Sequence, residues 1–426
     1  NEYVLRMPQL NAATAKSPID YQSRTPAAQS GWTVQPMGVG FFKLTAPNAT
    51  AAQVTNWSRQ VGARYIEVNA VREYARTPND TLYANPANWA FPKISADRAW
   101  DTATGTSSTI VAVLDSGVDY NHPDLAGNMW VNPNEIAGDG IDNDGNNFID
   151  DVHGVNADAG TGDPMDQFGH GTFCAGLIGA VGDNAVGMSG VNWSVQIMAV
   201  SIGNLFPTQA GIIAGANYIA AQKAAGQNVA AVNCSFGGPG FSQAMFDAFR
   251  LMGDSGIVVV CSAGNDSSNN DAVPAYPANF VLPQVISVAA STKSDQLAGF
   301  SNYGLTTVDL AAPGEDVLST LASASDPSTW PRLPANPGYG TSSGTSFAAP
   351  LVAGTAGLLK SIKPTASVQQ VKDAILGGVD RVSSLAGRVL TGGRLNVANA
   401  VALINTTGST PTASFKSGQG LKFLEG

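Results

Sequence analysis

The sequence predicts an α/β fold: a mostly parallel central sheet with helices on both faces, preceded by a smaller α+β unit. Two observations predict the large sheet: continuous apolar runs recur from residue 109 onward, and helical stretches separate them. Strands buried on both faces lack polar alternation, because helices cover both sides of a parallel sheet. A third observation is the length of 426 residues. Single cores stop growing at roughly 250 to 300 residues, so a second unit is expected.

The first 90 residues differ from the rest and contain a strand, a helix and a second strand close together. The apolar run at residues 40–44 predicts the first strand. Residues 51–61 carry apolar side chains at three- and four-residue spacing, which is typical of an amphipathic helix. Residues 63–68 predict the second strand. The turn formers at 77–80 then predict an exposed connection.

The large domain is predicted from five apolar runs and three helical stretches. The expected strands are residues 110–114, 196–200, 229–232, 257–260 and 285–288. The expected helices are residues 210–225, 242–255 and 348–361. Ligands of such open sheets bind at the carboxyl ends of the strands. Reactive side chains are therefore expected directly after the strands.

Composition excludes several classes of protein. The chain is 44% hydrophobic and only 13% charged, which is incompatible with intrinsic disorder. It has 32 acidic and 22 basic residues and no basic run that could neutralise phosphates, so we expect no nucleic-acid partner. It also has no apolar run of about 20 residues, so no membrane span is expected. The three cysteines, Cys174, Cys234 and Cys261, have small or apolar neighbours and are predicted to be buried thiols.

Three reactive residue types lie in glycine-bounded segments at strand ends or helix starts. Asp115 ends the first apolar run, His170 is flanked by glycines, and Ser346 follows Gly-Thr before a helix. A serine hydroxyl is a weak nucleophile until a base removes its proton. Histidine is such a base, and a buried carboxylate on its other ring nitrogen orients it. A fourth residue, Asn265, follows another strand, where its amide could donate to an oxyanion together with the Ser346 backbone N–H.

These segments together resemble the subtilisin-like serine protease family. The match covers roughly residues 92–404. The motifs, in chain order, are Asp115-Ser-Gly, Gly-His170-Gly-Thr, Ser-Phe-Gly-Gly at 235–238, Ala-Gly-Asn265 and Gly-Thr-Ser346-Phe-Ala-Ala-Pro.

The resemblance implies a three-layer subtilisin-like fold and a role for each of these residues. Asp115 would orient His170, His170 would be the general acid and base, Ser346 the nucleophile, and Asn265 part of the oxyanion hole.

The resemblance also implies where a peptide substrate binds. One wall would be Ser235, Phe236, Gly237 and Gly238. The other would include Ala263 and Gly264. The glycines would leave backbone groups free to pair with an extended peptide. These walls contain no acidic residue, so an apolar or small P1 side chain is expected.

An acidic loop at residues 139–151 predicts a Ca²⁺ site, because hard cations take six to eight oxygen ligands. Its candidate ligands are Asp142, Asp144, Asn146, Phe148, Asp150 and Asp151. The spacing departs from an EF-hand, and a solvated acidic turn is the alternative. By resemblance, Asp124 and Asn184 would form a second Ca²⁺ site.

The N-terminal unit is similar to the propeptide of these proteases. The expected organisation is therefore a propeptide-like inhibitor, chaperone and junction at 1–90, a catalytic domain at 91–404 and a tail at 405–426. Cleavage is expected between about residues 73 and 83. A permanently retained extension is the alternative.

Together these expectations describe a calcium-stabilised, secreted, monomeric serine endopeptidase that is made as a self-inhibited zymogen. Its partners would be protein substrates and its own propeptide. The N-terminus shows no signal peptide in this numbering. A peptide ligase or cyclase on the same fold, and a catalytically silent peptide-binding relative, are the alternatives.

Overall fold

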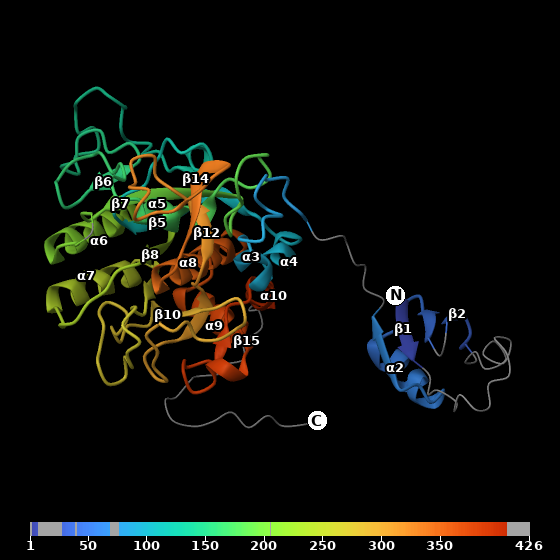
Figure 1. Ribbon diagram of the computed structural model, residues 1–426. Coiled ribbons are helices and arrows are strands. Elements are labelled where there is room, and N and C mark those ends of the chain that lie inside the picture. Colours follow the sequence, from blue (N-terminus) through green and yellow to red (C-terminus); the bar gives the residue numbers. More distant parts are fainter. Residues whose placement is uncertain (1, 7–27, 39–40, 69–75, 205, 407–426) are drawn as a thin grey trace. The chain divides into compact units, whose positions relative to one another are not determined.

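The computed structural model describes residues 2–6, 28–38, 41–68, 76–204 and 206–406 (Figure 1). The chain divides into two compact units, residues 1–74 and residues 75–426. Residues 76–90, the expected junction of the N-terminal piece, fall within the second unit. Part of the expected cleavage region, residues 73–75, lies outside the described residues. So do residues 407–426 of the expected tail.

In its described residues, the N-terminal unit is a four-stranded antiparallel sheet with the helix α2. The strand order is β2-β3-β1-β4. The elements are β1 (Glu2–Arg6), β2 (Thr33–Gly38), β3 (Phe41–Thr45), α2 (Ala51–Gln60) and β4 (Tyr65–Val68). The apolar face of α2, with Val54 and Trp57, packs with Leu5 and Leu44 of the sheet. The predicted strand, helix and strand are present as β3, α2 and β4, whereas β1 and β2 were not anticipated.

The second unit is built on a nine-stranded sheet with the order β15-β16-β11-β10-β9-β8-β5-β7-β6. All neighbours are parallel except β15 and β16. The strands are β5 (Gly105–Asp115), β6 (Gly154–Asn156), β7 (Ser194–Ser201), β8 (Val229–Cys234), β9 (Val258–Ser262), β10 (Val285–Ser291), β11 (Leu310–Pro313), β15 (Asp380–Arg381) and β16 (Gly393–Arg394). The five predicted strands are β5, β7, β8, β9 and β10.

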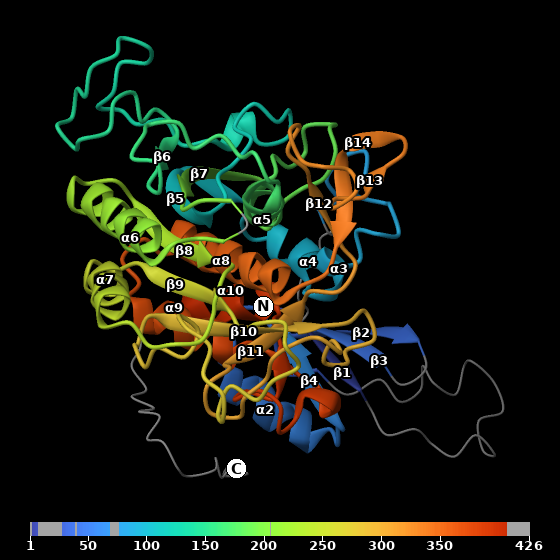
Figure 2. The same cartoon turned by 60° about the vertical axis from the view of Figure 1, so that its left-hand side comes forward.

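Helices cover both faces of this sheet (Figure 2). Val111 and Val113 of β5 belong to the core beneath α5 and α8, while Ile110, Ala112 and Leu114 belong to the core beneath α6 and α7. The continuous apolar run of β5 therefore contributes side chains to two cores, one on each face of the sheet. This confirms the predicted α/β class. The longer helices are α5 (His170–Gly179), α6 (Gln209–Ala224), α7 (Gln243–Asp254), α8 (Thr345–Ile362), α9 (Val368–Gly377) and α10 (Val397–Thr406).

Smaller elements complete the unit. They are α3 (Ala90–Lys93), α4 (Ala96–Trp100), the 3₁₀ turns η1 (Ala126–Asn128) and η2 (Ser383–Leu385), and a three-stranded antiparallel sheet of β12 (Val317–Thr320), β13 (Arg332–Leu333) and β14 (Asn336–Ser342). Within the described ranges, none of the helices has the length and apolarity that crossing a bilayer requires.

Candidate active site

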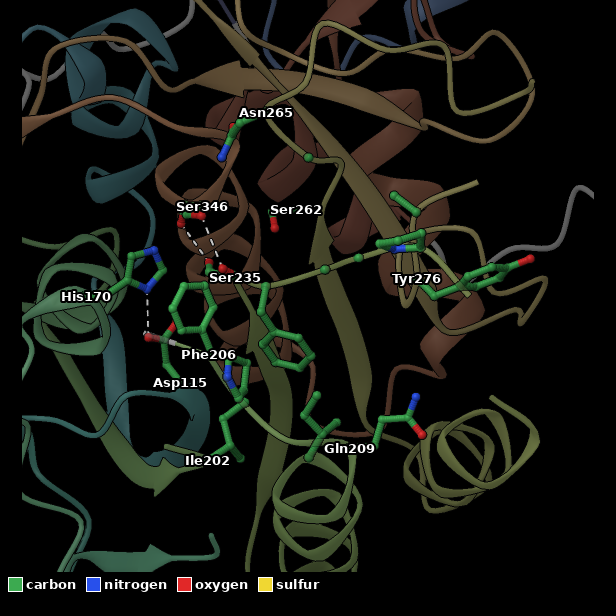
Figure 3. Close-up of a pocket in the computed structure, with 18 of the residues that line it drawn as sticks. Asp115, His170, Ile202, Phe206, Gln209, Ser235, Ser262, Asn265, Tyr276 and Ser346 are labelled. Atoms are coloured by element: carbon green, nitrogen blue, oxygen red, sulfur yellow. Dashed lines mark hydrogen bonds and ion pairs between the residues drawn. The ribbon is translucent and has the colours of Figure 1, made fainter. Parts of the chain in front are cut away.

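The carboxyl end of β5 and the first residue of α5 form a hydrogen-bonded acid–histidine pair. The His170 Nδ1–H donates to Asp115 Oδ1 at 2.7 Å, and the Ser116 N–H donates to the same oxygen at 2.7 Å. The Asp115 side chain is 5% exposed and that of His170 is 21% exposed. Because Nδ1 carries the hydrogen, Nε2 is left as the basic nitrogen, and it faces Ser346 (Figure 3).

The two segments approach closely because their residues are small. A Cβ on Gly171 would lie 2.0 Å from the Gly117 backbone oxygen and 3.1 Å from the Asp115 Cβ. Glycine at 171 therefore allows α5 to begin directly against the end of β5. Gly169, the residue before the helix, has φ of +109°, a conformation that favours glycine.

Opposing effects act on the pKa of His170. Burial lowers its pKa, but the charge and hydrogen bond of Asp115 and the charge of Asp166 outweigh burial, so the pKa is raised above its usual value of 6.5. The Cys174 thiol lies 3.8 Å from Asp115 Oδ2, and burial raises its pKa well above the usual value. Cys174 is therefore a neutral packing group beside the pair.

Ser346 lies in the first turn of α8 and is 9% exposed. Its Oγ–H donates to the Ser235 carbonyl oxygen at 3.1 Å, while the Ser235 Oγ–H donates to the Ser346 carbonyl oxygen at 2.7 Å. These bonds tie the start of α8 to the end of β8.

Asn265 is held by the residue before Ser346. Both the backbone N–H and the Oγ1–H of Thr345 donate to Asn265 Oδ1, at 2.8 and 2.9 Å. The amide oxygen is thereby occupied, and the Nδ2 group points toward Ser346 (Figure 3). Since the first N–H groups of a helix have no intrahelical partner, the start of α8 and Asn265 Nδ2 can together donate to an oxyanion.

These side chains open into a cleft of about 900 Å³. The predicted wall residues Ser235, Phe236, Gly237, Gly238 and Gly264 line it. On another side lie Gly203, Asn204, Phe206, Pro207 and Gln209, with Phe206 84% exposed.

Three expectations about the walls need correction. Ala263 does not line the cleft: it is fully buried, and its carbonyl accepts from Asn270 Nδ2. The backbone N–H and carbonyl of Gly238 are not free for a substrate, because both are paired with Tyr276, at 3.0 and 2.8 Å. An acidic side chain is also present, since Asp266 lies on the exposed edge of the cleft.

The structure brings Asp124 and Asn184 together and adds a third residue, Asp80. Asn184 Nδ2 donates to Asp124 Oδ1 at 2.9 Å, and burial raises the pKa of Asp124 to about 6. Asp80 Oδ2 accepts from the Asp183 N–H at 2.8 Å, whereas its Oδ1 is buried and has no hydrogen-bond partner among the described residues. An orphaned carboxylate oxygen beside a second buried carboxylate fits a cation.

Sequence reasoning missed Asp80 because it lies within turn formers. The segment 77–80 was expected to be an exposed connection, but Asp80 is 5% exposed. Its partners, Asp183 and Ser189, are more than 100 residues away. The Leu82 N–H also donates to the Gly187 carbonyl at 2.6 Å, so the junction is attached to this loop.

Two carboxylates of the acidic loop, Asp144 and Asp151, cluster with Glu135, which precedes the loop, and their ligand atoms lie within 4.8 Å of one another. Glu135 Oε2 is buried and has no hydrogen-bond partner in the part of the chain that the structure describes, and burial raises the pKa of Asp151 to about 6. Asn146 Nδ2 donates to Asp151 Oδ2 at 2.9 Å, which places Asn146 beside the cluster. This donor set also fits a hard cation.

Two of the predicted ligands, Asp142 and Asp150, are not part of this cluster. Asp142 accepts from the backbone N–H groups of residues 145–147, and Asp150 accepts from those of Gly138 and Gly140. The Phe148 ring packs on Tyr218, with ring centroids 5.6 Å apart. Asp142 and Asp150 accept from the turns of the loop, and neither lies in the cluster of Glu135, Asp144 and Asp151. Glu135 was missed because it precedes the repeating acidic pattern.

The remaining histidines and cysteines are structural. His122 Nε2–H donates to the Gly338 carbonyl at 3.0 Å, and His153 Nδ1–H donates to the Trp130 carbonyl at 2.9 Å. The predicted burial of Cys174, Cys234 and Cys261 is confirmed.

The chain is similar to known proteins of one family. The subtilase family profile matches residues 106–420. Thermitase of Thermoactinomyces vulgaris is 34% identical over 328 residues, covering 76% of this chain and 99% of thermitase. An extracellular protease of Xanthomonas campestris is 33% identical, covering 83% of this chain and 62% of the relative. Subtilisin-like protease 1 of Plasmodium berghei is 32% identical, covering 74% of this chain and 53% of the relative.

A solved structure agrees with these similarities. A protease from Pseudoalteromonas arctica has a TM-score of 0.60 and 28% sequence identity, covering 77% of this chain and all of that one. The chain spans between about half and two thirds of the length of the Plasmodium and Xanthomonas relatives. Because the family profile and the relatives match most of the chain, we conclude that the protein belongs to the subtilase family of serine peptidases.

Proposed function

We propose that this protein is a secreted, calcium-stabilised serine endopeptidase that cleaves peptide bonds through an acyl-enzyme on Ser346. The observation that carries the proposal is the meeting of four groups at one cleft. They are Asp115 and His170, which are joined by a hydrogen bond, Ser346 at a helix start, and Asn265, whose amide oxygen already accepts from Thr345. The extracellular protease of Xanthomonas supports secretion.

The steps follow from the positions of these groups. His170 Nε2 removes the proton from Ser346 Oγ as that oxygen attacks the carbonyl carbon of the scissile bond. Asn265 Nδ2 and the Ser346 N–H donate to the oxygen that becomes negative. The protonated His170, stabilised by Asp115, then gives its proton to the leaving amine. Water releases the acyl group by the same route in reverse.

Calcium would be held at two places if the proposal is correct. Asp80, Asp124 and Asn184 would hold one ion, and Glu135, Asp144 and Asp151 the other. The bound ions would neutralise buried carboxylates and stabilise the fold.

The substrate class proposed is peptides with an apolar or small P1 side chain. Ala275 and Tyr276 lie in the cleft near the wall residues, and the acidic Asp266 is at its exposed edge. Peptides that differ only at P1 test this: leucine or phenylalanine should be cleaved with a higher kcat/KM than arginine. A preference for arginine would contradict it.

Residues 1–74 are proposed to act as an inhibitory propeptide, because they form a compact unit of their own. N-terminal sequencing of incubated enzyme should show a new start before or near residue 83. Full activity with an unchanged Asn1 start would contradict this part.

A fluorophosphonate probe tests the proposed activity directly. Ser346 should be labelled in the incubated full chain, and Ser346→Ala should abolish labelling at that site. Absence of labelling in the wild type would overturn the proposal. Mass analysis of peptide products should show addition of water rather than transfer to an amine.

A further inference from the structure

A buried carboxylate outside the proposed triad joins the two segments that carry its acid and its base. Asp166 lies in the loop before α5 and is 0% exposed. Burial of a charged carboxylate is unfavourable unless hydrogen bonds compensate for the lost water. Asp166 therefore has to be held by nearby donors.

Five donors surround the Asp166 carboxylate. Oδ1 accepts from the Ser116 Oγ–H at 3.0 Å and from the N–H groups of Phe168 and Gly169 at 2.9 and 2.8 Å. Oδ2 accepts from the N–H and the Oγ1–H of Thr172 at 2.9 and 2.6 Å. Both oxygens are therefore fully used, and three of these donors are backbone groups near the start of α5.

The Ser116 hydroxyl connects the two segments. It donates to Asp166 and accepts from the Gly171 N–H at 2.9 Å. Ser116 directly follows Asp115, and Gly171 directly follows His170. The residue after the acid is thus bonded both to the residue after the base and to the buried Asp166 carboxylate.

We propose that Asp166 is a positioning residue: it holds the Asp115 and His170 segments in register and places a second negative charge near the imidazole. The inference rests on the proposed roles of Asp115, His170 and Ser346. A carboxylate suits this position because it offers acceptors only, whereas an asparagine would turn an NH₂ group toward one set of donors.

Besides forming these hydrogen bonds, the Asp166 carboxylate has a negative charge that affects the pKa of His170. The titratable groups around the ring are Asp115 at the end of β5, Asp166 in the preceding loop and Cys174 one helical turn later. The Coulomb interactions with Asp115 and with Asp166 both raise the pKa of His170, against the effect of burial. Removing the Asp166 charge should therefore lower the pKa of His170.

The test is the rate of fluorophosphonate labelling of Ser346 against pH, measured on the incubated full chain. For Asp166→Asn we expect a plateau rate lower by about tenfold to a hundredfold, because the base is displaced from the nucleophile. We also expect the acidic limb of the profile to move to lower pH. A role confined to stability would lower the melting temperature without moving this limb.

Two further variants separate charge from position. Asp163→Asn removes the same charge from the same loop at an exposed side chain, and it should label like the wild type. Ser116→Ala retains the Asp166 charge but removes the link to Asp115 and Gly171. It should label more slowly, with the acidic limb at the wild-type pH.

The outcomes are distinguishable. Failure of the wild type to label overturns the proposed function and this inference together. If the wild type labels, an Asp166→Asn limb at the wild-type pH, or a plateau rate equal to that of Asp163→Asn, overturns the inference alone. If Asp166→Asn does not fold, Ser116→Ala decides: a wild-type rate overturns the inference, and a slower rate with an unmoved limb supports it.

Discussion

The contact between α5 and the end of β5 makes Gly171→Ala a sharp test of the site. The added Cβ would lie 2.0 Å from the Gly117 backbone oxygen, and contacts under 3.0 Å are essentially never seen for real Cβ atoms. The helix start and the strand end must therefore separate by at least about 1 Å. The neighbouring His170 Nδ1 to Asp115 distance is only 2.7 Å, so this hydrogen bond would be broken or distorted.

The expected loss of activity follows from that displacement. A misplacement of about 1 Å costs on the order of 10²-fold, which corresponds to about 2.7 kcal/mol in the barrier. Alanine in place of glycine within a helix would by itself stabilise the protein by about 1 kcal/mol. Overpacking costs about 1 to 3 kcal/mol, so the melting temperature should still fall or remain level rather than rise.

The assay is kcat/KM on a peptide substrate, together with the melting temperature. Gly299→Ala is the matched control, because a Cβ there meets no atom within 4 Å and the residue is exposed. The control should behave like the wild type. The reasoning is refuted if Gly171→Ala keeps kcat/KM within about threefold of the wild type.

Three other predictions concern the oxyanion donor, the base and the calcium site. Asn265→Ala should lower kcat by about 10² to 10³, a range that belongs to subtilisin and is carried over to this relative; an unchanged kcat would exclude the amide as a donor. Because the pKa of His170 is raised and only its neutral form is a base, kcat/KM should rise with pH along a limb above the usual 6.5, and a limb below that value would contradict the assignment. Excess EDTA should lower the melting temperature. Asp80→Asn should reduce the rise in melting temperature that added Ca²⁺ produces, measured by calorimetry and compared with the exposed control Asp373→Asn. An equal rise in the two variants would remove Asp80 from the site.

The sheet could be predicted from local patterns. The run at residues 110–114 contains no polar residue because alternate side chains face two different cores. The same reasoning located β7, β8, β9 and β10. It did not locate β1, whose pairing with β3 joins residues 35 to 43 positions apart, nor β2, which pairs with the adjacent β3.

The candidate site could be predicted only in part. Glycine-bounded positions indicated Asp115, His170 and Ser346, since reactive groups at strand ends need close approach of other segments. The ligand candidates were less accurate. Asp142 and Asp150 are used by the turns of their own loop, and Glu135 belongs to the cluster instead. Whether a carboxylate accepts from its own turn or faces another carboxylate depends on backbone direction, which spacing does not specify.

By itself, the sequence determined the α/β class, the family and the chemical types of the reacting groups, because these depend on hydrophobic periodicity and on short motifs. Only the tertiary structure decided which groups meet. The Asp115–His170 bond spans 55 residues, and the Asp80 contact with Ser189 spans 109. Such contacts depend on how strands and helices pack, and burial then determines which carboxylates are left with an unpaired oxygen or surrounded by donors. Asp166 is an example, because packing buries its carboxylate among hydrogen-bond donors.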